Sequence, residues 1–457
     1  MNLHRMLTSR AQTGNPIRIG LVGAGKFGTM FLSQARTMVG VHILGIADLA
    51  VERMAERCLG IGWAKERLDA TNCQDAVDNG TTWLMENAEE MIRNGCIDVL
   101  IEATGSPAAG IHHCLMAIEQ GIHVIMANVE ADVVAGPLLA RKAQSAGMVY
   151  SLAWGDQPAL ICEHIDWART CGFDVVCAGK GTRHHPTFCQ STPQTVWNLY
   201  GLDPQDAERG GMNPKMFNSF VDGSKSAIEM TAVCNASGLT PQEDGLGFPP
   251  ASCRELAQVC KPHFDGGVLS HVGTTEVVSS LNYDMSPVED DLRFGTFVVV
   301  TSDNNYVRRC FGEYGMQVDE TGRYCALFRP SHMIGLELGI SVASVALRGE
   351  PTGAPFSWSA DTIAVAKRDL KAKEILDGEG GCCVWGKQVP ADQSHKNGLV
   401  PLGLTHDVML SHDIPRGKQL CWDDIEYDES CEIMKIRREM EAEFGSDIGG
   451  LAVTSTC

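Results

Sequence analysis

Short apolar runs alternate with segments in which apolar residues recur every three or four positions along the first third of the chain. The runs predict strands that begin at residue 17 and at 41–47, 83–85, 98–103, 123–128 and 149–153. The other segments predict helices that begin near Lys26, at 51–59, 88–94 and 108–120, and one that ends at Ala146. This alternation is typical of the α/β class with a doubly wound parallel sheet, so we expect a Rossmann domain over residues 17–160.

The first predicted strand breaks on a glycine triplet, Gly23-Ala24-Gly25-Lys26-Phe27-Gly28, and a helix follows. In such a loop the first glycine permits a tight turn, the second lets the backbone approach a pyrophosphate, and the third lets the helix pack against the strand. The second strand ends on Asp48, whose carboxylate is placed to bind the ribose 2′-OH of NAD. Arg53 and Arg57 follow closely and could hold the 2′-phosphate of NADP, so these residues leave the choice of cofactor open.

Small and polar residues follow the later strands, at the end of the sheet where doubly wound folds bind ligands. We expect them to border the nicotinamide half of the cofactor, and ordinary turn chemistry is the alternative for each of them. The candidate cofactor-binding residues are Gly23, Ala24, Gly25, Lys26, Phe27, Gly28, Asp48, Arg53, Thr104, Gly105, Asn128, Glu130, Gly155, Asp156, Gln157 and Pro158.

The pattern changes in residues 161–350, where strands come in runs with longer loops between them. A helix over 160–170 and strands at 174–179, 276–280, 296–301 and 324–328 predict an α+β domain that binds the substrate. The segment 240–250, rich in Pro and Gly, predicts a surface loop. An apolar helix is expected over 331–347, because Arg348-Gly349-Glu350-Pro351 supplies the usual stop signals.

The last segment, residues 351–457, is rich in glycine and predicts β-structure with an acidic tail. Two stretches echo each other, Ala366–Leu376 and Leu410–Leu420, and each runs from a strand into a turn made of Asp and an apolar residue. The pattern resembles the SAF fold, a small β-clip unit. The acidic residues 423–428 and 439–443 predict a solvated helix face rather than a site.

Composition narrows the class of protein. The chain has 457 residues and a formal net charge of −20, which disfavours nucleic acid as a partner. It has no apolar run long enough to span a membrane. The 18 cysteines lack C-x-x-C spacing, which argues against a zinc site or a disulfide framework and favours a reducing cytoplasm. Residues 1–16 predict a flexible arm, with a transit peptide as the alternative.

Three stretches outside the Rossmann domain combine cations with small polar residues: 180–185, 213–229 and 329–332. An enzyme that transfers hydride to an anionic substrate needs such cations, together with a proton donor beside the carbonyl oxygen. The candidate catalytic residues are Lys225, Lys215, Asp222 and Glu229. The candidate substrate-binding residues are Lys180, Arg183, His184, Asn213, Ser219, Arg329 and His332.

Local structure supports these candidates in the second and third stretches. Asp222 or Ser224 is placed to cap a helix that ends at Gly238, and Lys225 and Glu229 then share one face of it. If that face lines a cleft, a desolvated lysine can transfer a proton. The third stretch is expected at the N-terminus of the apolar helix, where a phosphate would bind.

Each candidate also has an ordinary alternative. Lys225 and Glu229 would form a surface ion pair if their face met water. Lys180 and Arg183 would be solvated loop charges and His184 a surface residue, and His332 would cap its helix. The spacing of Glu130, Asp156, Asp222 and Glu229 identifies no metal site, so a divalent metal such as Mg²⁺ or Mn²⁺ stays open.

With these motifs the chain resembles the homoserine-dehydrogenase-like oxidoreductases that carry a C-terminal SAF domain. The likeness rests on Val22–Gly28, Gly155–Pro158, Lys215–Glu229 and Ala366–Gly378. Within that family it is most similar to the second-type, reductoisomerase-like 1-deoxy-D-xylulose-5-phosphate reductoisomerases. It departs from homoserine dehydrogenases, which set their Asp and catalytic Lys four apart, whereas Asp222 and Lys225 are three apart.

The resemblance implies an NADPH-dependent rearrangement and reduction of a phosphorylated ketose in isoprenoid synthesis, blocked by fosmidomycin. It also implies a homodimer built through the central domain. In this interpretation Lys225 protonates the oxygen, while Lys180, Lys215, Arg329 and His332 hold the phosphate and hydroxyls. Two alternatives stay open: a dehydrogenase of another small hydroxy acid or sugar acid, and a nucleotide or ligand sensor without turnover.

Overall fold

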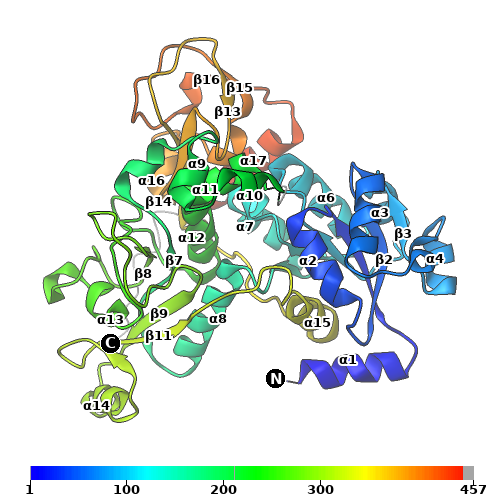
Figure 1. Cartoon of the computed structure of the whole chain (residues 1–457), viewed down its shortest axis with the longest axis horizontal. Helices are drawn as coiled ribbons and strands as arrows, with labels where there is room; N and C mark the ends of the chain where they lie inside the picture. The colour runs from blue at the N-terminus through cyan, green and yellow to red at the C-terminus, as the bar shows by residue number, and fades with distance from the viewer. Residues whose placement is uncertain (1, 210–211, 446–457) are drawn as a thin grey trace. The chain divides into compact units, whose positions relative to one another are not determined.

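The computed structural model describes residues 2–209 and 212–445, and these form two compact units (Figure 1). The first unit comprises the chain up to Leu160 together with Met333–Phe356 and Lys435–Arg437. The second comprises the other described residues, from Ile161 to His332 and from Ser357 onward.

A six-stranded parallel sheet forms the centre of the first unit. Its strands are β1 (Ile17–Val22), β2 (Val41–Ala47), β3 (Trp83–Met85), β4 (Val99–Glu102), β5 (His123–Met126) and β6 (Tyr150–Leu152). They lie in the order β3-β2-β1-β4-β5-β6, and every pair is parallel. The strands are almost wholly buried, because helices cover the faces of such a sheet. The predicted doubly wound Rossmann sheet is therefore confirmed.

Several helices of this unit begin where the sequence supplies a capping side chain. Asn72, Asn87, Ser106 and Asn128 each accept a backbone N–H in the first turn of the helix that follows. The helices are α2 (Lys26–Ala35), α3 (Val51–Gly60), α4 (Cys73–Asn79), α5 (Ala88–Arg93), α6 (Pro107–Glu119), α7 (Val129–Ser145) and α15 (Gly339–Arg348), and α8 (Gln157–Thr170) leads into the second unit.

The expectation of a flexible arm over residues 1–16 is wrong, because Leu3–Gln12 forms helix α1. Leu3 and Leu7 are buried in the hydrophobic core of the first unit, and Met6 packs against it. This spacing of three and four residues places the apolar side chains on one side of a helix. The prediction of a flexible arm followed the charge of the two arginines in this segment rather than its apolar spacing.

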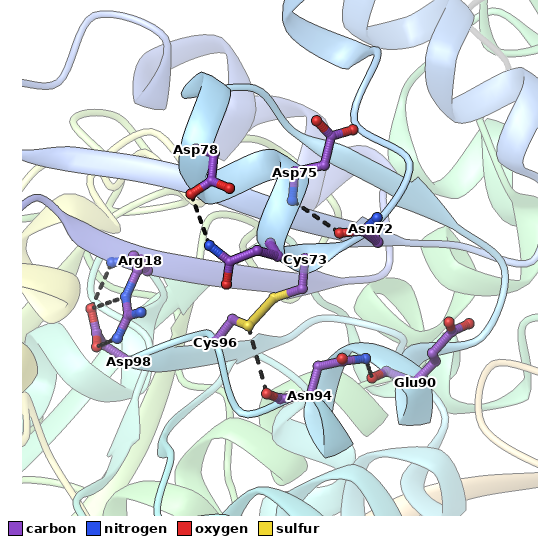
Figure 2. The surroundings of a disulfide bond; sticks show 10 residues. Arg18, Asn72, Cys73, Asp75, Asp78, Glu90, Asn94, Cys96 and Asp98 are labelled. Atoms are coloured by element: carbon purple, nitrogen blue, oxygen red, sulfur yellow. Dashed lines mark hydrogen bonds and ion pairs between the residues drawn. A yellow bond between two sulfur atoms is a disulfide. The ribbon is translucent and has the colours of Figure 1, made fainter.

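A disulfide joins Cys73, at the start of α4, to Cys96, in the loop before β4 (Figure 2). The two residues are 23 positions apart in the sequence, and their Cα atoms lie 6.4 Å apart. No cysteine spacing motif had paired them. Close by, Arg18 forms an ion pair of 2.7 Å with Asp98, which ties the start of β1 to that of β4.

The second unit contains a mixed five-stranded sheet, which confirms the expected α+β arrangement. Its strands are β7 (Asp174–Thr182), β8 (Thr274–Ser279), β9 (Thr296–Thr301), β10 (Gln317–Val318) and β11 (Cys325–Arg329), in the order β10-β11-β9-β7-β8. Only β7 and β8 run parallel among these described strands. One face packs on the second half of α8 and on α12 (Ser224–Ser237), and the opposite face packs on α13 (Leu256–Val259).

Shorter elements surround this sheet. They are α9 (Val196–Tyr200), α10 (Pro204–Arg209), α11 (Pro214–Val221), α14 (Asn305–Glu313) and two 3₁₀ turns, Pro186–Gln190 and His263–Asp265. Residues 240–250 form a loop, as predicted.

The helix expected over 331–347 begins only at Gly339, so that prediction is wrong for its first half. Gly335 has a left-handed φ of +72°, which is incompatible with a right-handed helix at this position. A Cβ at Gly335 would lie 2.8 Å from the carbonyl oxygen of Phe27, so this turn packs closely on α2. Arg329 and His332 therefore do not lie at a helix N-terminus.

The C-terminal β-structure belongs to the second unit, and a separate domain over residues 351–457 stays a prediction. Strands β12 (Ala360–Ala366) and β14 (Val384–Pro390) form an antiparallel pair. Strands β13 (Ile375–Asp377), β15 (His406–Leu410) and β16 (Ile425–Glu426) form a second small sheet, and helices α16 (Ala391–Lys396) and α17 (Glu432–Phe444) follow them. The assignment of this region as an SAF domain stays a prediction.

Candidate functional site

The glycine loop of the first unit has the geometry of a phosphate cradle. Gly23 has φ +92°, and a Cβ there would lie 2.5 Å from the carbonyl oxygen of Ala103. A Cβ at Gly28 would collide with the carbonyl oxygen of Gly23, which explains the third glycine. Nothing lies within 4 Å of a Cβ built on Gly25, and the backbone N–H groups of the first turn of α2 follow it. The space above Gly25 is therefore open to a pyrophosphate.

Two charged side chains from neighbouring elements hold this loop. The Asp48 carboxylate accepts the backbone N–H of Ala24 at 2.8 Å and that of Ala50 at 2.9 Å. The Arg57 guanidinium donates to the carbonyl oxygen of Ala24 at 2.7 Å. Asp48 thus lies beside the loop as predicted, and Arg57, although left out of the candidate set, touches the loop directly. In dinucleotide-binding folds a carboxylate at this place hydrogen-bonds the 2′-OH of the adenosine ribose, and a guanidinium beside it can bind the 2′-phosphate of NADP.

The other predicted cofactor residues lie along the same edge, because β1, β4, β5 and β6 are neighbours. Asn128 donates to Thr104 Oγ1 at 3.3 Å and to the carbonyl oxygen of Ser106 at 2.8 Å, and it also caps α7. Gly105 has φ +71° and open space at its Cβ position. Asn128 therefore positions the loop after β4, and its buried side chain acts through that loop.

The turn after β6 is the least open part of this edge. Gly155 has φ +93°, and a Cβ there would lie 2.9 Å from the carbonyl oxygen of Met333. The carboxylate of Asp156 accepts the backbone N–H of Gln157 at 2.9 Å, and both side chains are buried. Taken together, the glycine cradle, Asp48 and the open space at Gly25 and Gly105 fit a nicotinamide dinucleotide.

In the second unit, strand register aligns three polar residues across neighbouring strands. Lys180 on β7 pairs with Thr296 on β9, and Thr296 pairs with Arg329 on β11. Residues that face each other in antiparallel strands point to the same side of the sheet. Here that side is the one covered by α8 and α12, since Ala178 and Val298 of the same alternation lie in its core.

The two helices that cover this side of the sheet, α8 and α12, add one polar residue each to Lys180, Thr296 and Arg329. Glu229 of α12 forms a buried ion pair with Lys180, and each side chain is only 3% exposed. His164 of α8 hydrogen-bonds through Nε2 to Thr296 Oγ1 at 3.1 Å. Burial, aided by the positive charge of Arg329, lowers the pKa of His164 to about 4, so its ring is neutral at physiological pH. We name Lys180, Glu229, Thr296, His164 and Arg329 the polar row.

The structure thus brings together three of the predicted site residues, Lys180, Glu229 and Arg329. The polar row shows that Lys180 is not a solvated loop charge. Lys225 lies one helical turn before Glu229 on the same side of α12 and is half-buried. His164 and Thr296 were missed, because one sits in an amphipathic helix and the other opens an apolar strand. Only the strand register reveals them.

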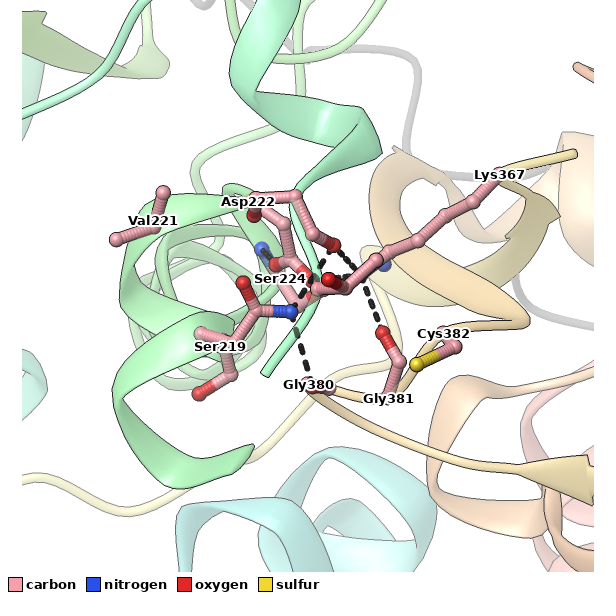
Figure 3. Close-up of polar contacts among 12 residues, drawn as sticks. Ser219, Val221, Asp222, Ser224, Lys367, Gly380, Gly381 and Cys382 are labelled. Carbon is pink, nitrogen blue, oxygen red and sulfur yellow. Dashed lines mark hydrogen bonds and ion pairs between the residues drawn. The ribbon is translucent and has the colours of Figure 1, made fainter. Parts of the chain in front are cut away.

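Asp222 belongs to a second buried cluster, shown in Figure 3. Its carboxylate accepts the backbone N–H of Ser224 at 2.8 Å and forms an ion pair of 2.7 Å with Lys367. The N-cap residue of α12 is Gly223, so the expectation that Asp222 or Ser224 occupies that position is wrong. Burial raises the pKa of Asp222, and the ammonium of Lys367 offsets part of that shift. Lys367 also donates to the carbonyl oxygens of Ser191 and Gly381 at 2.8 and 2.7 Å. This cluster ties α12 to the C-terminal β-structure.

The candidates on α11 have structural partners in the same unit. Lys215 donates through Nζ to the carbonyl oxygen of Asp377. Asn213 caps α11 through the backbone N–H of Lys215 at 3.0 Å. Ser219, labelled in Figure 3, donates to the carbonyl oxygen of Met216 at 2.8 Å. These contacts fix α11, and none of them joins the polar row.

The remaining predicted residues lie on other loops. Arg183 donates to the carbonyl oxygen of Leu199 at 2.9 Å, at the end of α9. His184 is buried, with its ring 4.0 Å from that of Phe248, so it is not a surface residue. His332 hydrogen-bonds through Nδ1 to the carbonyl oxygen of Phe294 at 2.7 Å.

A metal site is not evident in the described part of the chain. Among those residues, no three His, Cys, Asp or Glu side chains gather where they could hold a metal ion. Glu130, Asp156, Asp222 and Glu229, the carboxylates considered from the sequence, lie on separate elements. We therefore assign no step to a metal.

Two family models match the chain, and they divide it near the end of the Rossmann sheet. Residues 20–152 match the model described as the NAD-binding domain of homoserine dehydrogenase. Residues 155–338 match the model described as the catalytic domain of the oxidoreductase DRL. A comparison with curated proteins finds no match. The polar row lies within the second matched region.

Several solved structures are similar in part. A homoserine dehydrogenase from Thiobacillus denitrificans is 19% identical over 49% of this chain and 50% of its own, with a TM-score of 0.34. An oxidoreductase domain protein from Kribbella flavida is 11% identical over 39% of this chain and 46% of its own, with a TM-score of 0.28. A probable dehydrogenase from Thermotoga maritima is 12% identical over 73% of this chain and 90% of its own, with a TM-score of 0.37. This chain spans about half the length of the first two proteins.

Among the described residues, no helix is both long enough and apolar enough to cross a bilayer.

Proposed function

We propose that this homoserine-dehydrogenase-like oxidoreductase, which takes a nicotinamide cofactor, uses NADPH to convert 1-deoxy-D-xylulose 5-phosphate into 2-C-methyl-D-erythritol 4-phosphate. The substrate skeleton first rearranges without net oxidation to a branched aldehyde. Hydride from NADPH then adds to the aldehyde carbon and one proton adds to its oxygen, which yields the alcohol and NADP⁺. The observation that carries the proposal is the polar row together with Lys225, one helical turn before Glu229, because they collect cationic and proton-transferring groups inside the region that matches an oxidoreductase catalytic domain.

The residues take distinct roles in this proposal. Arg329, which is half-buried, holds the phosphate, because a guanidinium binds phosphate oxygens in a bidentate manner. Lys225 donates the proton to the oxygen that becomes charged as hydride arrives. Glu229 and Lys180 neutralise each other's charge. Their ion pair holds α12 against β7, and it therefore holds in place the side of the helix on which Lys225 lies. The neutral ring of His164 hydrogen-bonds the buried hydroxyl of Thr296, so these two residues position the strands that carry Lys180 and Arg329.

The match of residues 20–152 favours one other candidate within the same reaction class. A homoserine-dehydrogenase-type cofactor domain would also serve a dehydrogenase of another small hydroxy acid or sugar acid. In that case the same cations would bind a carboxylate, and the reaction would need no rearrangement of the carbon skeleton.

A direct assay distinguishes the two candidates. Purified full-length protein is mixed with NADPH and 1-deoxy-D-xylulose 5-phosphate, with and without fosmidomycin, and the product is identified by NMR. We expect NADPH oxidation, a branched polyol phosphate and inhibition by fosmidomycin. Failure to oxidise NADPH with this substrate, together with NAD(P)⁺ reduction by homoserine or a sugar acid, would select the second candidate. A matched Arg329→Lys variant should raise the KM for a phosphorylated substrate, since it keeps the charge and loses the bidentate geometry.

A further inference from the structure

The second unit contains a cavity of about 490 Å³ that the polar row does not use. It is bounded by the start of α12, by the loop 244–248, by the segment 184–190 and by the strands β12 and β14 of the C-terminal β-structure. A cavity of this volume lies in the range that holds small organic ligands.

Aromatic groups form part of its wall. The rings of His184 and Phe248 lie 4.0 Å apart, and Trp385 contributes its indole from β14. The loop that carries Phe248 is fixed from below, because the buried carboxylate of Glu276 accepts the backbone N–H groups of Gly247 and Phe248 at 3.0 and 3.3 Å. Flat aromatic faces held in place in this way suit the apolar face of a ring.

Two cations line the same cavity without a carboxylate partner. Within the described residues, the side chains of Lys387 and Arg416 make no hydrogen bond and no ion pair. Lys367 also borders the cavity, but its ammonium is already occupied by Asp222 and two carbonyl oxygens. The lining includes one carboxylate, Asp244, so the cavity keeps an excess of positive charge in a chain whose net charge is −20.

The cavity and the polar row lie on different sides of α12. Ala227 lines the cavity, whereas Glu229, two residues further on, pairs with Lys180. Residues two positions apart on an α-helix do not face the same way. A ligand in the cavity would therefore be separated from the polar row by the helix itself.

From these observations we infer that the cavity is a second binding site, for a sugar phosphate or a ligand of the same kind. The ring would lie against Trp385 and the His184–Phe248 wall, and Lys387 and Arg416 would hold the anionic group. This site is independent of the reaction proposed above, and it gives the C-terminal β-structure a role in ligand binding.

The test uses full-length protein and the intrinsic fluorescence of Trp385, with D-ribose 5-phosphate as the probe. We expect saturable quenching that is absent in a Trp385→Phe variant. D-ribose and inorganic phosphate, each titrated alone, should bind at least about tenfold more weakly, because each supplies only one half of the interaction. Equal binding of phosphate alone would overturn the role of the aromatic wall, and equal binding of ribose alone would overturn the role of the cations.

Charge variants locate the site. Lys387→Met combined with Arg416→Met should weaken binding of the probe by about tenfold or more, while Lys396→Met, which removes an exposed lysine of the same unit, should leave it unchanged. Arg416→Met alone, at an exposed position, serves if the double variant has an altered near-UV circular dichroism spectrum. Wild-type affinity in these cavity variants, or no quenching of the wild-type protein at millimolar probe, would overturn the inference. Neither readout depends on turnover, so the assay of the proposed reaction can fail or succeed separately.

Discussion

Lys180 and Glu229 form an ion pair that joins the interior strand β7 to helix α12, with both side chains almost wholly removed from solvent. The residues are 49 positions apart, so the pair exists only in the folded chain. A buried ion pair contributes little net stability, but the loss of one partner leaves an uncompensated charge in the interior. The pair therefore makes the fold of the second unit sensitive to either single change.

Lys180→Met should lower the free energy of unfolding by about 3–5 kcal/mol, because it leaves Glu229 buried and unpaired. The double variant Lys180→Met with Glu229→Leu should recover most of that loss. Urea unfolding followed by circular dichroism measures both, and Lys371→Met, which removes one partner of an exposed pair with Asp413, is the matched control. A double variant no more stable than the single one would contradict this account of the pair.

Lys225→Met tests the proposed proton donor. We expect kcat to fall by about 10²–10⁴-fold, the range for loss of a general acid, with the Kd for NADPH almost unchanged. Stopped-flow reduction and a fluorescence titration with NADPH measure the two quantities separately. Lys373→Met, which neutralises an exposed lysine in the C-terminal β-structure, controls for the loss of charge. Equal losses in kcat and in NADPH affinity would argue against a role in proton transfer.

The Rossmann sheet was predictable because local signals agree with the tertiary structure. Each apolar run stops on turn residues, and β2 and β3 have the predicted bounds. The prediction of a long apolar helix was wrong in its first half for the converse reason: Gly335, with its left-handed φ, interrupts an apolar stretch that the hydrophobic pattern alone indicates is continuous. Likewise, the apolar spacing of α1 is present in the sequence, but the prediction of a flexible arm followed the charge of that segment instead.

The echo between Ala366–Leu376 and Leu410–Leu420 reflects a real pairing. Leu370 and Ile414 exchange both backbone hydrogen bonds, at 2.8 and 3.0 Å. The Asp413 carboxylate accepts the N–H of Ala372, and Asp369 accepts that of Arg416, at equivalent positions. Repetition in the sequence thus predicted a symmetric contact.

Partners distant in the sequence could not be predicted in this way. Lys367 and Asp222 are 145 positions apart, and Thr296 enters the polar row only through strand register. Lys180, Glu229 and Arg329 could be predicted as candidates because each lies in a stretch that combines charge with small polar residues. Their neighbours in the polar row could not be predicted, because those contacts arise only from tertiary packing.

Arg57 should contribute to selectivity for NADPH. Its guanidinium lies at the carbonyl of Ala24, beside Asp48, where a 2′-phosphate would meet a positive charge. We expect Arg57→Met to raise the KM for NADPH by about tenfold or more and to change the KM for NADH much less, because only NADPH carries that phosphate. Arg36→Met, which removes a positive charge directly after α2, serves as the control for the loss of charge. An equal effect on both cofactors would instead assign Arg57 to holding the glycine loop.

Asp132, on the first turn of α7, is a buried acid in the first unit. The Tyr150 hydroxyl donates to its Oδ1 at 2.7 Å, and Glu102 and Cys114 are the other titratable groups close by. Burial raises the pKa of Asp132 from its ordinary 3.8 to about 7, and the bond from Tyr150 offsets part of the shift. The folded chain therefore keeps a proton that the unfolded chain has already lost between these two values.

This difference fixes the sign of the pH dependence. Between about pH 4 and about pH 7 the folded state binds more protons at this site, so the contribution of Asp132 to the free energy of unfolding falls as pH rises, by up to about 1.4 kcal/mol per pH unit. Asp132→Asn keeps an oxygen for the Tyr150 hydroxyl but does not titrate, so the difference between wild type and variant isolates the effect. Urea unfolding from about pH 5 to about pH 8 should show wild type losing stability relative to the variant up to about pH 7 and little further change above it. A difference that is constant with pH would mean that Asp132 is already ionised in the fold throughout this range, which would contradict the raised pKa.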